Sequence, residues 1–302
     1  MNEPALERWV AKLNIQWYPG HMTKTRRMIE SDLKLVDLVA EVIDARIPSS
    51  SRNPDIDELV GRKPRLMILN RADQADPALT RRWAEYFRDH GCAVLETDSK
   101  TGNGVSQFSA AVRGALRDQI ARWREKGQVG RSVRVMVVGV PNVGKSTFIN
   151  KVARRKSAKA QDKPGVTRGK QWVAVDAGMD LLDTPGILWP KFEDQEVGRK
   201  LAYTGAIKDD IMDVEDLGCS LIELLARHYP QALTARYQIT PNEDAPGWTL
   251  LEAAGRRRGF LISGGEVDLN RMSRILLDEF RSGKLGRFTL ETPEGEGQDG
   301  GK

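Results

Sequence analysis

The sequence predicts an α/β domain with a three-layer parallel sheet, followed by an all-helical domain. Apolar runs alternate with helical patterns from residue 37 to residue 152, which is typical of parallel strands with helices on both faces. A glycine-rich segment at residues 139–146 separates one apolar run from a helix. From residue 195 to residue 282 the pattern is helical throughout, which predicts a second domain.

Each element is expected from its periodicity and its flanking residues. Strands are expected at residues 37–43, 65–69, 93–96, 133–138 and 171–176, and in a run that ends at Asp183. Helices are expected from Thr23 onward, at residues 55–60, 79–90 and 106–126, and from the glycine-rich segment through Val152. In the second domain, the spacing of four leucines predicts an amphipathic helix. These are Leu217, Leu221, Leu224 and Leu225.

Length and composition set the domain organisation. A chain of 302 residues is long enough for two cores, which we place at residues 1–192 and 193–288. Residues 289–302 are rich in glycine and polar residues, and we expect a disordered tail there. No uncharged apolar run approaches the ~18 residues of a membrane span, and the start lacks a signal-peptide pattern, so we expect a cytoplasmic protein.

Residues 139–146 fit the pattern GxxxxGK[ST] between a strand and a helix, which predicts a phosphate-binding P-loop. In such a loop, backbone N–H groups surround the phosphates at a helix N-terminus. Lys145 is expected to neutralise the β- and γ-phosphates, and the Ser146 hydroxyl is expected to bind magnesium. The loop residues expected to contact a nucleotide are Asn142, Val143, Gly144, Lys145, Ser146 and Thr147.

Two further segments complete the predicted phosphate site. Asp183 ends a strand, where a P-loop NTPase places its magnesium-side aspartate, and the N–H of Gly186 is expected to sense the γ-phosphate. Thr167 lies in the connector that precedes residues 171–176, and it is a candidate to hold magnesium and the attacking water. An ordinary loop threonine is the alternative, which the sequence leaves open.

The segment Asn70-Arg71-Ala72-Asp73 follows a strand and resembles the guanine-reading NKxD motif, with Arg71 in place of lysine. The Asp73 carboxylate would accept hydrogen bonds from guanine N1–H and the exocyclic amine, whereas adenine presents an acceptor at N1. GTP is therefore favoured over ATP. Asn70 as a helix cap is the alternative. Residues 98–102, with Ser99 and Lys100, resemble the SAK motif that supports the guanine, but begin with an aspartate.

The base-reading motifs precede the P-loop, whereas they follow it in ordinary GTPases, so the order is circularly permuted. Several motifs together resemble the YlqF/RbgA family, ribosome biogenesis GTPase A, over nearly the whole chain. These are residues 16–22, 44–48, 70–73, 139–147 and 183–186. The resemblance implies a circularly permuted P-loop GTPase domain, a helical RNA-binding domain and a role in late maturation of the large ribosomal subunit.

The resemblance also implies how the protein works. Its partners would be the rRNA and proteins of immature large subunits, with no DNA, and these particles would stimulate a hydrolysis that drives release. The alternative is a GTP-dependent RNA- or protein-binding switch outside the ribosome. Ile187 stands where signalling GTPases carry a water-orienting glutamine. The resemblance assigns that task to His21, and it links Asn142 to potassium-assisted hydrolysis.

Some alternatives stay open at this stage. His21 is either catalytic or a structural or RNA-contacting residue, and Asn142 either assists a potassium ion or simply bonds within its loop. The net charge of +5 favours a polyanionic partner, but both basic clusters have a solvated face as their alternative. These clusters are Lys151, Arg154, Arg155, Lys156, Lys159, Lys163, Arg168 and Lys170, and Arg256, Arg257, Arg258, Arg271, Arg274, Arg281 and Lys284. Trp248 is expected in the core rather than against a base.

Overall fold

The computed structural model describes most of the chain as two compact units. The described residues are 22–154, 171–176, 178–184, 186, 194–207, 209 and 212–293. The first unit contains the described residues up to 186 together with residues 289–293, and the second contains those from 194 to 288. Within these ranges, no helix has the length and apolar composition that crossing a bilayer requires. His21, Thr167 and Ile187 lie outside the described residues.

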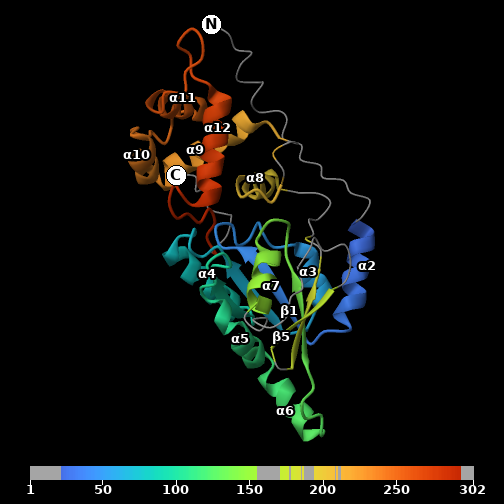
Figure 1. Ribbon diagram of the computed structural model, residues 1–302. Coiled ribbons are helices and arrows are strands. Elements are labelled where there is room, and N and C mark those ends of the chain that lie inside the picture. Colours follow the sequence, from blue (N-terminus) through green and yellow to red (C-terminus); the bar gives the residue numbers. More distant parts are fainter. Residues whose placement is uncertain are drawn as a thin grey trace, which may run out of the picture. The chain divides into compact units, whose positions relative to one another are not determined.

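A six-stranded sheet with the order β3-β2-β1-β4-β6-β5 forms the centre of the first unit (Figure 1). Its strands are β1 (Leu38–Asp44), β2 (Arg65–Asn70), β3 (Ala93–Thr97), β4 (Val133–Val138), β5 (Gln171–Asp176) and β6 (Met179–Asp183). The predicted strands are confirmed to within one residue at each end. Only β5 departs from the predicted parallel arrangement, because two residues connect it to β6 and so short a connection forces an antiparallel pair.

Two helices of this unit begin at side-chain caps that the sequence supplies. The helices described in this unit are α2 (Met22–Leu33), α3 (Pro54–Val60), α4 (Pro77–Asp89), the 3₁₀ turn η1 (Val105–Gln107), α5 (Phe108–Ala115), α6 (Arg117–Glu125) and α7 (Lys145–Arg154). Asn53 and Asp76 cap α3 and α4, each followed by proline. The expected helix at 106–126 is instead divided at Leu116. Leu116 is the last buried side chain there, and α6 beyond it buries none.

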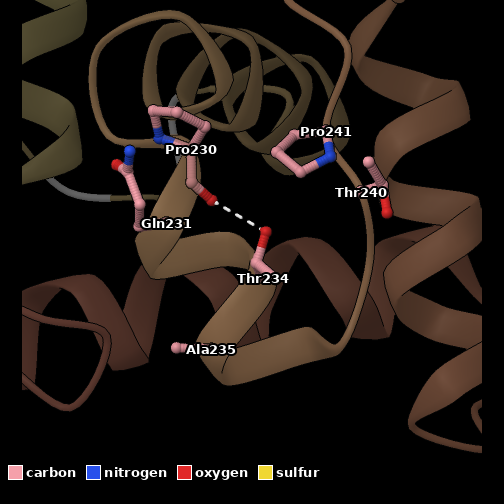
Figure 2. Close-up of a pocket in the computed structure, with 6 residues that line it drawn as sticks. All are labelled: Pro230, Gln231, Thr234, Ala235, Thr240 and Pro241. Atoms are coloured by element: carbon pink, nitrogen blue, oxygen red, sulfur yellow. Dashed lines mark hydrogen bonds between the residues drawn. The ribbon is translucent and has the colours of Figure 1, made fainter.

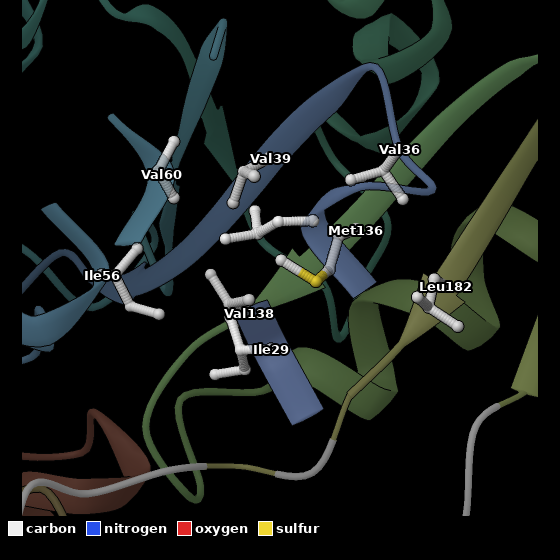
Figure 3. Packing of buried hydrophobic residues seen from close by; sticks show 9 residues of the cluster. Ile29, Val36, Val39, Ile56, Val60, Met136, Val138 and Leu182 are labelled. Atoms are coloured by element: carbon white, nitrogen blue, oxygen red, sulfur yellow. The ribbon is translucent and has the colours of Figure 1, made fainter. Parts of the chain in front are cut away.

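Both faces of the sheet are covered. On one face, apolar side chains of α2 and α3 pack on β1, β4 and β6 (Figure 3). They include Ile29, Val39, Ile56, Val60, Met136 and Leu182. On the same face, Trp83 and Phe87 of α4 pack on Ile43, Met67 and Leu69 of β1 and β2. The helices α5 and α7 cover the opposite face, where Phe108 and Phe148 meet edge to face at 5.2 Å. The predicted three layers are present.

The described part of the second unit contains five helices, in agreement with the helical pattern. They are α8 (Gln195–Tyr203), α9 (Val214–His228), α10 (Pro230–Tyr237), α11 (Gly247–Arg257) and α12 (Leu269–Ser282). Leu217, Leu221 and Leu225 are buried, as their spacing predicts, whereas Leu224 is half-buried. The expectation for Trp248 is wrong. This side chain is 48% exposed, because the buried stripe of α11 passes through Leu250, Leu251 and Ala254 instead.

A buried carboxylate joins three segments of the helical unit. Glu279 of α12 accepts hydrogen bonds from Arg236 Nε at 2.9 Å and from the Tyr237 hydroxyl at 2.8 Å, and Arg258 Nη2 lies 3.2 Å away. The hydrogen bonds from Arg236 hold the pKa of Glu279 below its ordinary value, against the opposing effect of burial. Nothing in the sequence marked this residue, since its partners lie far apart along the chain.

Residues 289–291 do not form the disordered tail expected from the sequence. Thr289 and Glu291 are buried, and the segment makes hydrogen bonds within the first unit. Glycine and charge dominate only beyond this point, from Glu294 onward, outside the described residues. The composition of the whole segment therefore concealed three ordered residues at its start.

Candidate functional site

Five strands place the motifs at one edge of the sheet. Since β1, β2, β3, β4 and β6 run parallel, the segments that follow their carboxyl ends meet at the same edge. Asn70 ends β2, the segment at 98–102 follows β3, the glycine-rich loop follows β4, and Asp183 ends β6. The structure thus brings together segments that lie up to 113 residues apart, from Asn70 to Asp183.

The glycine-rich loop has a backbone that only certain residues adopt. Gly144 has φ +95°, and a Cβ atom there would lie 2.3 Å from Asn70 Nδ2. Asn142 has φ 61°, a left-handed conformation that asparagine tolerates better than most residues. The loop leads directly into α7, whose first residue is Lys145, while Ser146 and Thr147 are exposed in its first turn. This N-terminal turn is the arrangement that binds phosphate groups.

Asn70 joins three loops through one side chain. Its Nδ2 donates to the carbonyl of Val143 in the glycine-rich loop at 2.7 Å. Its Oδ1 accepts from Thr97 Oγ1 at 3.1 Å and from the N–H and hydroxyl of Ser99 at 3.1 and 2.6 Å. Asn70 is only 2% exposed. It caps no helix, because α4 begins after Asp76, so the capping alternative does not hold.

Arg71 makes a second connection to the same loop. Its Nη2 donates to the carbonyl of Asn142 at 2.9 Å, and its Nε lies 3.6 Å from Asp44 Oδ2. Asp44 in turn holds Arg46 through two bonds of 2.9 and 2.7 Å. Burial acts to raise the pKa of Asp44, but the guanidinium of Arg46 outweighs it and holds that pKa below its usual range. Arg46 is fully buried.

Asp73 and the segment after β3 lie beside this connection. The Asp73 side chain is exposed, and desolvation of its carboxylate together with the nearby Asp98 raises its pKa. The Asp98 side chain is buried and forms hydrogen bonds within its own turn. Its Oδ1 accepts from the N–H groups of Lys100 and Thr101 at 2.8 and 3.2 Å, so it shapes the turn that presents Ser99. This explains an aspartate where the SAK motif begins with serine.

Lys145 and Asp183 form the phosphate side of the site. Lys145 Nζ donates to Asp183 Oδ1 at 2.9 Å and also to the carbonyl of Thr184, and both charged side chains are buried. A Cβ atom on Gly186 would lie 3.0 Å from Pro141 Cα, so the segment after β6 passes close to the glycine-rich loop. Among the predicted site residues, His21 and Thr167 lie outside the described part of the chain.

The sequence model described as "50S ribosome-binding GTPase" matches residues 134–242. Ribosome biogenesis GTPase A of Bacillus cereus is 47% identical, over 94% of this chain and 96% of its own. The chain belongs to the ribosome biogenesis GTPase A family. The member from Thermotoga maritima is 32% identical over 93% of this chain, and Mitochondrial ribosome-associated GTPase 1 of Mus musculus is 35% identical over 91%.

Solved structures of the ribosome biogenesis GTPase A family share the fold. YlqF from T. maritima with bound GNP has a TM-score of 0.64 and 30% identity, covering 90% of this chain and 99% of that one. A GDP-bound YlqF structure has a TM-score of 0.66 and 30% identity, covering 89% of this chain and all of that one. The predicted fold, a circularly permuted P-loop GTPase domain with a helical C-terminal region, is therefore confirmed.

The structure adds site residues that the sequence-based analysis did not single out. Asp44 and Arg46 were recognised only as part of a family motif, and their position at the end of β1 was the signal that could have placed them in the site. Ser99 was expected beside a guanine, and the structure shows in addition that it holds Asn70. No feature of the sequence indicated a structural role for Glu291, because it lies in a segment of low complexity.

A pocket in the helical unit is separate from these motifs. It has a volume of about 430 Å³ and is lined by Pro230, Gln231, Thr234, Ala235, Thr240 and Pro241 (Figure 2). Thr234 Oγ1 donates to the carbonyl of Pro230 at 3.2 Å, within its own helix. The residues that line it include no charged side chain and none of the predicted site residues.

Proposed function

We propose that this member of the ribosome biogenesis GTPase A family binds immature large ribosomal subunits and promotes a late maturation step. It is a GTPase that converts GTP and water to GDP and phosphate, and hydrolysis drives its release from the particle. One observation carries the nucleotide part: Asn70 and Arg71 of the base-reading motif donate hydrogen bonds to consecutive carbonyls of the glycine-rich loop. These bonds hold the base-reading motif against the phosphate-binding loop, although the motif precedes the loop in the sequence.

In the proposed complex, the Asp73 carboxylate accepts from guanine, and residues 142–147 surround the phosphates. The phosphates replace Asp183 as the partner of Lys145. Magnesium fits the side chains present, because the Asp183 carboxylate and the Ser146 hydroxyl are the oxygen ligands it prefers. When bound, it would neutralise charge on the β- and γ-oxygens.

The remaining roles are proposals for residues that the geometry does not test. His21 orients the attacking water, Thr167 contributes its hydroxyl to magnesium, and the Gly186 N–H senses the γ-phosphate. Asn142 assists a potassium ion beside the β/γ bridge. Equal hydrolysis rates in potassium and sodium salts at matched ionic strength would contradict that role.

Arginines of the helical unit are proposed to contact the rRNA of the particle. The structure distinguishes four of these residues. Arg258 and Arg281 form ion pairs with Glu279 and Asp209, which assigns them to the fold. Arg257 and Arg271 are exposed and remain candidates for phosphate contacts. A location in the cytoplasm also stays a prediction.

The test is sedimentation through a sucrose gradient with a non-hydrolysable GTP analogue, with GDP as the matched control. We expect the protein to sediment with large subunits or their precursors only in the presence of the analogue. Lys145→Ala should sediment with neither nucleotide. If the wild-type protein hydrolyses GTP but stays at the top of every gradient, the switch outside the ribosome is the better interpretation.

A further inference from the structure

Residues 289–291 return from the helical unit to the GTPase unit and bind the loop that follows β1. The N–H of Leu290 donates to the carbonyl of Arg46 at 2.8 Å. Thr289 Oγ1 donates to the carbonyl of Ala45 at 3.1 Å, and the indole N–H of Trp83 donates to the carbonyl of Glu291 at 3.1 Å. Each residue of this return segment therefore makes at least one specific bond.

The carboxylate of Glu291 makes the strongest contacts of this segment. It accepts from the N–H of Ser49 at 2.6 Å, from the N–H of Ser50 at 3.2 Å and from the Ser50 hydroxyl. Glu291 is only 5% exposed. A buried carboxylate is costly unless its oxygens are bonded, and bonds to an ionised acceptor are about twice as strong as neutral ones. The β1–α3 loop thus depends on Glu291 for three of its donors.

This loop continues directly into the nucleotide site. Its Ser51 hydroxyl accepts from the N–H of Asp44 at 2.9 Å. Asp44 holds Arg46 by two bonds, and Asp44 Oδ2 lies 3.6 Å from Arg71 Nε. Arg71 donates to the Asn142 carbonyl. An unbroken series of contacts therefore leads from the return segment to the glycine-rich loop, through two strand ends and four charged side chains.

We propose that the return segment positions the nucleotide site by holding the β1–α3 loop, so that Asp44 keeps Arg71 against the glycine-rich loop. The inference rests on the proposed guanine-nucleotide site. Phe288, the residue before the segment, is buried in the helical unit, where it stacks on Phe280 at 5.7 Å. No spacer separates Phe288 from Thr289, so a displacement of the helical unit acts directly on the residues that hold this loop. Nucleotide affinity then depends on the state of the helical unit.

The test measures the affinity and dissociation rate of fluorescent mant-GDP on the full chain. Glu291→Ala should weaken GDP binding roughly 3- to 30-fold, as expected for a residue that acts through a contact network. The loss should appear as faster dissociation. Glu291→Gln keeps the shape but not the charge, and should lie between Ala and the wild type. A chain that ends after residue 293 is the matched control and should bind as the wild type does.

A double-mutant cycle separates positioning from a general loss of stability. If Glu291 acts through Arg71, then Glu291→Ala should add less than about a factor of 2 to the loss caused by Arg71→Ala. If the fold loss of GDP affinity in the double mutant equals the product of the two single-mutant losses, the inference is overturned. All measurements are made well below the melting temperature of each variant, and Glu291→Gln decides the case if Glu291→Ala does not fold.

The two proposals fail in different ways. If the wild-type chain binds no guanine nucleotide, the proposed function is wrong. If the wild type binds GDP and both Glu291 variants bind it equally well, the nucleotide site stands and only the positioning role is refuted.

Discussion

Asn70→Ala removes the side chain that joins the base-reading loop, the segment after β3 and the glycine-rich loop. Four hydrogen bonds are lost, one to Val143 and three from Thr97 and Ser99. All three partners are buried, so water cannot readily replace Asn70. At about 0.5–1.5 kcal/mol for each bond, the loss of stability amounts to roughly 2–6 kcal/mol.

The loss should be present without any nucleotide, because the four bonds lie within the protein. For a unit of this size each kcal/mol corresponds to about 2–4 °C in melting temperature, so we expect a decrease of at least ~4 °C. Thermal unfolding of the nucleotide-free protein, followed by tryptophan fluorescence, measures it. GDP affinity should fall as well, since the glycine-rich loop loses its contact with β2.

Asp73→Asn is the matched control for this experiment. The Asp73 side chain is exposed, so its replacement should change stability by no more than about 0.5 kcal/mol. An Asn70→Ala protein that melts within 2 °C of the wild type would refute the structural role assigned to Asn70. So would an equal destabilisation by both substitutions.

Four other substitutions test separate parts of the molecule. Asp73→Asn should weaken GTP and improve xanthosine triphosphate, whose O2 accepts from the new amide, in a nucleotide-competition assay. Lys145→Ala should reduce nucleotide binding and phosphate release together, and unchanged affinity would contradict the P-loop assignment. His21→Ala should leave GTP affinity and particle binding nearly intact but lower particle-stimulated turnover roughly 10²-fold or more. Full stimulated turnover would exclude a catalytic His21. Glu279 has a lowered pKa, so its contribution is present above its ordinary value of 4.5 and is lost as the pH falls below it. Glu279→Gln should therefore destabilise the helical unit by about 1–3 kcal/mol at pH 7, with a smaller difference in urea unfolding at lower pH.

Periodicity and motif spacing were sufficient to predict the strands and helices of the GTPase unit. They also predicted that the motifs lie at one edge of the sheet. Each β-strand is a short apolar run with a clear boundary, and a motif that follows a parallel strand must lie at its carboxyl end. Asn70 and Lys145 could therefore be assigned to one site from the sequence alone. The predicted parallel arrangement was wrong for β5, although the two-residue connection to β6 contains the information.

Contacts between distant side chains could not be predicted in the same way. Whether Trp248 is buried depends on how α11 is rotated about its own axis relative to the helices that it packs against. The periodicity of the sequence does not define this rotation closely enough. Asp98 looked like a departure from a motif, and its role in shaping a turn became visible only with its backbone partners. Glu291 is a single acidic residue near a polar segment. Its role is visible only from its hydrogen bonds to the loop around Ser49.

The distance along the chain between Ser49 and Glu291 affects the order of events during synthesis. Glu291 follows Ser49 by 242 residues. At a translation rate of about 5–20 residues per second, Glu291 is synthesised roughly 12–50 s after the loop whose N–H groups it binds. The other five strands, β2 to β6, and the helices α8 to α12 are translated in that interval. A chain that ends before Glu291 therefore contains every strand of the GTPase sheet but lacks the carboxylate that binds the loop after β1, so this loop gains its last contacts only after the helices α8 to α12 have been synthesised.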